Sequence, residues 1–254
     1  MDEGIFYVPI LQKSAFFLFY TCSLECVMHV SLSETTAIIV LWSLPMKLYY
    51  IPAACSLSPH IIIHELGLDV SLIKVDHKTH LTEAGDDYYQ VNPLGYVPAL
   101  ELEDGTVLRE GAAIVQYLGD LRPELGLVPA HDSLDRYRLQ EWLGFLGAEI
   151  HKGFIPLLYA TLAGRYVETV KPRLEARFAW VDAQLQGRSY LMGERFTVAD
   201  TYLFALVGWG QAHWLTSYYR ADIHFDHLHN LQAWYDRVVA RPAVQQALSE
   251  EGLL

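Results

Sequence analysis

The sequence predicts an α/β domain followed by an all-helical domain. From Lys47 to Leu118, short apolar runs and helical patterns follow one another as strand, helix, strand, then strand, strand, helix. This order predicts a compact mixed sheet of about 80 residues. After a break at 121–132, which contains two prolines, apolar residues recur only at helical spacing. We therefore expect one domain at 46–127 and an all-helical domain at 132–254.

The first domain opens with a strand, a turn and a helix that place a cysteine at their junction. An apolar, aromatic run predicts a buried strand, which Pro52 ends because proline cannot donate to the ladder. Ser58 and Pro59 predict the N-cap and first residue of a helix that closes at Gly67. Cys55 then lies before a helix N-terminus, whose dipole favours the thiolate. A small buried apolar residue is the alternative interpretation.

Three further patterns complete the first domain. The β-branched run 70–75 predicts a second strand, parallel to the first. Val97-Pro98 leads directly into a third strand, which suits proline if its peptide is cis or if no ladder donor is needed. The segment 103–106 predicts a hairpin turn, after which a helix starts near residue 110.

Four apolar stripes predict the helices of the second domain. They lie within 139–150, 174–185, 197–207 and 231–239. Thr197 with Asp200 has the spacing of a capping box. We expect this pair to govern folding rather than catalysis.

Residues 1–45 differ from the rest of the chain. Their apolar runs show no clear period, and neither run reaches the length of a membrane span. The acidic start Met1-Asp2-Glu3 is unlike the basic start of a signal peptide. We expect 1–45 to be an extension outside the native fold, which would begin at Met46; a targeting segment is the alternative.

Charge and cysteine content exclude several classes of protein. A net charge of −12 argues against a nucleic-acid or anionic-membrane surface. Three cysteines are too few for a secreted disulfide scaffold and favour a reducing cytoplasm. Cys22 and Cys26 have no partner ligands at metal-site spacing, and the His/Asp run 222–229 reads as a solvated loop, so we expect no metal.

The βαβ-ββα layout, with a cysteine at the first junction and Val-Pro before the third strand, is similar to the thioredoxin-like fold. With helices after it, the chain from 46 to 254 resembles the cytosolic glutathione transferases, and in particular the bacterial beta class. The motifs that carry the resemblance are Ala54-Cys55-Ser56, the run 92–100 (NPLGYVPAL), Glu110-Gly111, the run 151–154 (HKGF) and the run 197–200 (TVAD).

The resemblance implies roles around the glutathione sulfur. Cys55 would face this sulfur and can form a mixed disulfide with it. His151 would lie across the cleft and donate to either sulfur, although a helix-surface histidine is the alternative. The backbone of Val97 would bind the cysteinyl part as an added strand does, and Pro98 would fix that edge in a cis turn.

The resemblance also implies a binding site for the γ-glutamyl end. Glu110 would pair with the ammonium group, while N–H groups at Glu110-Gly111 would bind the carboxylate; a solvated first-turn Glu110 is the alternative. His80 stands where the family usually has a lysine for the glycine carboxylate. Gly144 stands where an asparagine would reach the neighbouring subunit's glutathione. The sequence therefore departs from the family at two contacts.

Other hydroxyl groups could also activate glutathione. Tyr49 or Tyr50 could replace the tyrosine of other classes, but packing in a strand is the preferred interpretation. Ser56 could replace the serine of theta-like classes, and we expect it only to assist Cys55.

The function that the resemblance implies is conjugation of glutathione to small hydrophobic electrophiles in detoxification, with disulfide reductase or peroxidase activity beside it. Alternatives are an isomerase or dehalogenase on the same fold, or a non-enzymatic ligand-binding or regulatory protein. The electrophile site would lie in the helical domain; the expected lining is Phe154, Tyr159, Trp209 and His213. The family also implies a homodimer.

A chain that begins at Met46 is expected to fold and to bind glutathione as well as the full chain, because the patterns after Met46 are self-sufficient. Calorimetric titration with glutathione on both lengths measures this. An insoluble or inactive shorter chain would make 1–45 part of the fold.

Overall fold

The computed structural model describes residues 18–22, 25–32, 35–41 and 45–254. They fall into two units, Met1–Leu44 and Pro45–Leu254. In the first unit, β1 (Leu18–Cys22), β2 (Glu25–Leu32) and β3 (Thr35–Leu41) pair consecutively and antiparallel. The expected extension also includes residues outside the described ones, namely 1–17, 23–24, 33–34 and 42–44. That 1–45 is not part of the native fold stays a prediction.

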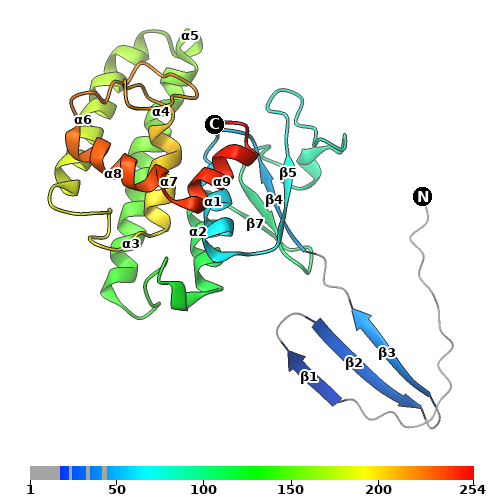
Figure 1. Ribbon diagram of the computed structural model, residues 1–254. Helices are drawn as coiled ribbons and strands as arrows, with labels where there is room; N and C mark the ends of the chain where they lie inside the picture. Colours follow the sequence, from blue (N-terminus) through cyan, green and yellow to red (C-terminus); the bar gives the residue numbers. More distant parts are fainter. Residues whose placement is uncertain (1–17, 23–24, 33–34, 42–44) are drawn as a thin grey trace. The chain divides into compact units, whose positions relative to one another are not determined.

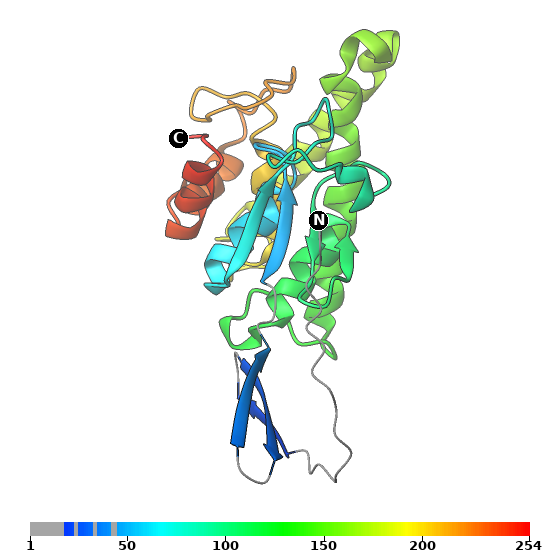
Figure 2. The same cartoon turned by 90° about the vertical axis from the view of Figure 1, so that its right-hand side faces the viewer.

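The second unit opens with the predicted mixed sheet. Its strands are β4 (Met46–Tyr50), β5 (Val70–Lys74), β6 (Ala99–Glu101) and β7 (Val107–Arg109), in the order β5-β4-β6-β7. β5 is parallel to β4, whereas β6 and β7 are antiparallel to their neighbours. α1 (Leu57–Leu66) and α2 (Gly111–Asp120) lie on the face of the sheet toward the helical domain (Figures 1 and 2). The alternation of strands and helices is confirmed.

The start of α1 differs from the prediction. The helix begins at Leu57, and the N-cap position belongs to Ser56, not Ser58. The Ser58 hydroxyl is buried and shares a 2.8 Å hydrogen bond with Thr201 Oγ1. The Ser-Pro pattern was typical of a cap, but a contact distant in sequence uses the hydroxyl instead. Gly67 does close the helix, in the left-handed region at φ 59°.

The second domain is helical throughout its regular elements, as predicted. The helices are α3 (Leu134–Phe145), α4 (Lys152–Leu158), α5 (Ala160–Ala163), α6 (Val167–Leu185), α7 (Val198–Val207), α8 (His229–Val239) and α9 (Pro242–Glu250). A π-helical stretch, η3 (Leu146–His151), joins α3 to α4. α8 ends at Val239, shortly before Pro242, and Pro242 is the first residue of α9, a helix that the sequence did not predict.

α7 is the central helix of the core, since every one of its residues is buried. Its capping box is confirmed, with Asp200 accepting the Thr197 N–H at 2.9 Å. The same carboxylate accepts the Leu191 N–H and the Trp234 indole N–H, each at 2.9 Å. Burial raises the pKa of Asp200, although these donors oppose the shift. Asp200 therefore joins three segments of the helical domain.

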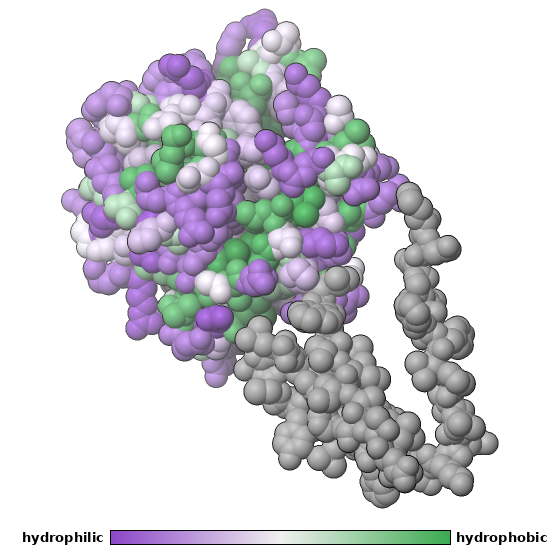
Figure 3. Space-filling model, turned by 45° about the vertical axis from the view of Figure 1, so that its right-hand side comes forward, coloured by the Kyte–Doolittle hydropathy of each residue, from purple (hydrophilic) through white to green (hydrophobic). Residues whose placement is uncertain are grey.

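The surface of this unit is mixed. Hydrophilic residues cover most of the face seen in Figure 3, and smaller hydrophobic patches lie among them. Within the described residues, every helix is too short or too polar to span a membrane.

Asp200→Ala is expected to lower the free energy of unfolding by roughly 3 kcal/mol or more, because it leaves three buried donors without an acceptor. Urea unfolding measures the loss. Asp236→Ala, at an exposed position of α8, is the matched control and should change stability by less than about 0.5 kcal/mol. Equal effects of the two substitutions would contradict the role given to Asp200.

Candidate functional site

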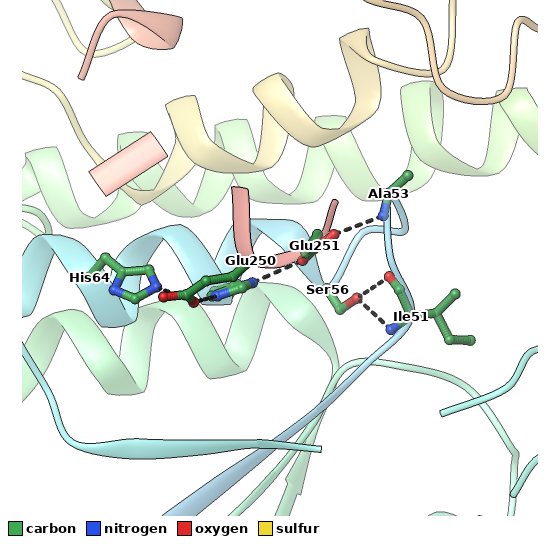
Figure 4. A network of polar contacts seen from close by, with 7 residues as sticks. Ile51, Ala53, Ser56, His64, Glu250 and Glu251 are labelled. Carbon is green, nitrogen blue, oxygen red and sulfur yellow. Dashed lines mark hydrogen bonds and ion pairs between the residues drawn. The ribbon is translucent and has the colours of Figure 1, made fainter. Parts of the chain in front are cut away.

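The turn between β4 and α1 is held by two side chains of the helical domain, Glu251 and Trp209. Ala53 has a positive φ of 63°, a conformation that side-chain-bearing residues rarely adopt. Its N–H donates to Glu251 Oε2 at 2.8 Å, and its C=O accepts the Trp209 indole N–H at 2.8 Å. Ser56 Oγ accepts the Ile51 N–H and donates to the Ile51 C=O, and these two hydrogen bonds close the turn (Figure 4). No local signal in the sequence pointed to Glu251 or Trp209 in this role.

Cys55 lies on this turn, half-buried, and its thiol donates to the Val97 carbonyl at 3.3 Å. Burial raises the pKa of this thiol to about 12; its own N–H, Lys152 and the Ser56 N–H lower it by less. The helix terminus was expected to favour the thiolate, but desolvation outweighs its effect on this pKa. Cys55 is a neutral donor.

The segment that faces Cys55 combines the expected glutathione-binding positions. The Val97-Pro98 peptide is cis, which is one of the two arrangements that the sequence left open and the one that the resemblance implied. A Cβ added to Gly111 would lie 3.6 Å from Pro98, so the start of α2 packs on this edge. Glu110 precedes α2 at φ 68°, ψ 114° with an exposed side chain. A non-glycine residue in this region carries backbone strain, which is common at functional sites.

His151 lies at the end of η3 and approaches the turn through an aromatic contact. Its ring centroid is 5.0 Å from that of Trp209, the residue that binds Ala53. Nδ1 shares a 2.8 Å hydrogen bond with the Tyr202 hydroxyl. Burial, with a smaller effect of Lys152, lowers the pKa of His151 to about 4. At neutral pH the imidazole is therefore neutral.

A cavity of about 1180 Å³ opens beside the Cys55 turn. Its walls include Pro52, Cys55, Leu81, Ile155, Tyr159, Trp209 and Tyr219. Tyr159 and Trp209 were expected there. Phe154 instead is fully buried in the core, and His213 is exposed and pairs with Asp226. The cavity mixes aliphatic and aromatic walls with Lys74 and Arg220.

The other expected residues are placed as follows. The His80 ring packs at a tilt against Tyr89, with 4.7 Å between the centroids, and its buried Nδ1 has no partner within the described residues. Gly144 lies on α3, where an added Cβ would meet open space. Tyr49 is buried and donates to Glu101 Oε2 at 2.7 Å, so it packs in the strand as preferred. Tyr50 is also buried.

Family profiles match both domains. The profile described as "Glutathione S-transferase, N-terminal domain" matches residues 54–121, and the C-terminal domain profile matches 148–242. The chain is 43% identical over 208 residues to the glutathione S-transferase GstA of Escherichia coli O157:H7, which is 82% of this chain and 100% of that protein.

Solved structures of glutathione S-transferases are similar to this chain in sequence and in fold. A bacterial beta-class glutathione S-transferase of Sphingomonas chungbukensis is 38% identical with a TM-score of 0.73, and the match covers 82% of this chain and 100% of that one. A sphingomonad glutathione S-transferase complexed with glutathione is 41% identical with a TM-score of 0.72 over the same shares of the two chains. The present chain, with its thioredoxin-like first domain and helical second domain, belongs to the glutathione S-transferase family of enzymes.

Proposed function

We propose that the chain binds glutathione along Val97 and Glu110 and conjugates it, through its sulfur, to small hydrophobic electrophiles held in the cavity beside Cys55. The observation that carries the proposal is the position of Cys55. Its thiol donates a hydrogen bond to the Val97 carbonyl, and Cys55 also forms part of the cavity wall. A glutathione sulfur placed against Cys55 would therefore meet an electrophile in the cavity.

The γ-glutamyl end is proposed to bind at the start of α2. The Glu110 carbonyl accepts N–H groups of Ala113 and Ile114, at 2.9 and 3.0 Å. The N–H groups before them have no helical partner and suit a carboxylate. The exposed Glu110 carboxylate suits the ammonium group of the same amino acid. In this proposal Gly111 and Pro98 form the floor, and His80 is the candidate donor to the glycine carboxylate.

The reaction needs donors to the glutathione sulfur rather than a base on the protein. The Cys55 thiol keeps its proton, so it can donate to a glutathione thiolate. The neutral His151 can donate through Nε2 when Tyr202 donates to its Nδ1. The glutathione thiol loses its proton to solvent, and its thiolate sulfur then forms a bond to the electrophilic carbon. The leaving group departs with its electron pair.

A homodimer and a cytoplasmic role in detoxification belong to the same proposal. Leu94 and Tyr96 on the first domain, and Leu134 and Tyr137 on α3, are exposed large hydrophobic residues that suit pairing of unlike domains between two subunits. Sedimentation at micromolar concentration measures the assembly, and a monomer would refute the dimer. The sparse cysteines support a reducing compartment.

Glutathione affinity tests the proposal directly. Glu110→Gln should weaken binding of glutathione about tenfold, because the ammonium group loses a charged acceptor. Retention on immobilised glutathione and turnover of a panel of electrophiles are the readouts. Glu103→Gln, at an exposed position of the hairpin turn, is the control and should behave as wild type. Binding without turnover of any electrophile would favour the non-enzymatic alternative.

The raised pKa of Cys55 predicts how its disulfide chemistry depends on pH. Cys55 thiolate attacks one sulfur of glutathione disulfide, forms a mixed disulfide and releases glutathione thiolate. Far below a pKa of about 12, the thiolate fraction rises about tenfold with each pH unit. Intact mass over a pH series, with Cys22 and Cys26 changed to Ser, should show adduct formation that accelerates accordingly. Cys55→Ala should gain no mass, and a rate independent of pH would contradict the neutral thiol.

A further inference from the structure

We infer that His60, His64 and Glu250 form a binding site for a divalent transition-metal ion such as Zn²⁺. His60 and His64 lie one turn apart on α1, and Glu250 is the last residue of α9. Figure 4 shows His64 and Glu250 pointing toward each other. One potential ligand atom of each residue lies within 4.8 Å of the others. Within the described residues, no other group of histidine, cysteine or acidic side chains meets this distance.

The two distances from the carboxylate to the imidazoles are close to those of a metal site. Glu250 Oε2 lies 2.8 Å from His60 Nε2 and 2.9 Å from His64 Nε2. In a tetrahedral zinc site with bonds of about 2.0 Å, neighbouring ligand atoms are about 3.3 Å apart. Glu250 Oε2 therefore needs to move away from each of the two nitrogens by only about half an ångström. The side chain of Glu250, 35% exposed, has room for that shift.

The buried side of the site already has the support that metal-bound histidines use. His60 Nδ1 donates to Glu251 Oε1 at 2.9 Å, and both side chains are fully buried. A carboxylate on the far nitrogen keeps a proton on Nδ1 and holds the ring in place, so a metal can take the position of the proton that Nε2 now shares with Glu250. Glu251 is itself fixed, since its Oε2 accepts the Ala53 N–H. His60 is thus oriented before any metal arrives.

The donor set and the exposure indicate the class of ion. Two imidazoles with one carboxylate suit zinc, and calcium and magnesium prefer sites made of oxygen alone. Solvent reaches the site, because the side chains of His64 and Glu250 are 16% and 35% exposed. Water can supply the fourth ligand from that side. On binding, the ion replaces the protons on the two Nε2 atoms, which leave to solvent.

The site would join the two ends of the second unit. α1 follows the Cys55 turn, whereas α9 is the last helix of the chain, and the two helices pack together. A metal that bridges them would stabilise the position of Glu251 and, through it, the Ala53 turn. We therefore expect the ion to be structural and to lie outside the electrophile cavity, whose lining includes none of the three ligands.

Calorimetric titration of the full, metal-free chain with ZnCl₂ tests the inference. Wild type should bind one Zn²⁺ per chain, and its Tm should rise with zinc. His64→Gln and Glu250→Gln should each weaken binding at least about tenfold and abolish the rise in Tm, because each removes one of three ligands. Both residues are on the surface side of the site, so the variants should fold. If one does not, the other gives the result.

Controls separate this site from other zinc ligands. His224→Gln alters an exposed His–Asp pair and should bind as wild type. Titration with Co²⁺ should give the visible bands of a tetrahedral site without a sulfur charge-transfer band, which excludes cysteine ligands. The inference is overturned if wild type binds no zinc, if His64→Gln and Glu250→Gln bind like wild type, or if the cobalt spectrum shows sulfur ligation.

Discussion

The Ala53 turn depends on two hydrogen bonds that cross almost the whole chain. Its N–H and C=O are bonded to side chains 198 and 156 residues later in the sequence. A backbone group left unpaired in the interior costs about 1–3 kcal/mol, and Ala53 also has a strained positive φ. The conformation that presents Cys55 is thus stable only when α9 and Trp209 are in place. The helical domain therefore fixes the first domain's reactive turn.

Local signals in the sequence predicted most of the fold. The change from alternating strands and helices to helical spacing alone predicted a mixed sheet followed by a helical part, because burial of one face imposes those periods. Gly67, the hairpin at 103–106 and the Thr197 capping box each use chemistry contained within a few residues. Where the sequence misled, at Ser58, a hydroxyl of the right type was taken by Thr201, far along the chain.

The site was predictable as a set of positions but not as a set of electrostatic states. The order of motifs gave Cys55, Val97 and Glu110, and the structure brings the first two into contact. The order of motifs could not predict the burial of Cys55, which depends on tertiary packing. This burial raises the pKa of the thiol, whereas the helix terminus was expected to lower it. Charge state follows from tertiary surroundings, which a motif does not encode.

The same argument explains why Glu251 carried no signal. A glutamate three residues from the end of a chain reads as solvated, yet this one is fully buried. Burial of a carboxylate is tolerable only with strong donors, and here His60 and the Ala53 N–H supply them. Because Glu251 follows α9, which itself starts at an unforeseen Pro242, the network becomes visible only when both ends of the unit are placed together. The turn that presents Cys55 thus depends on residues that none of the predicted site motifs contains.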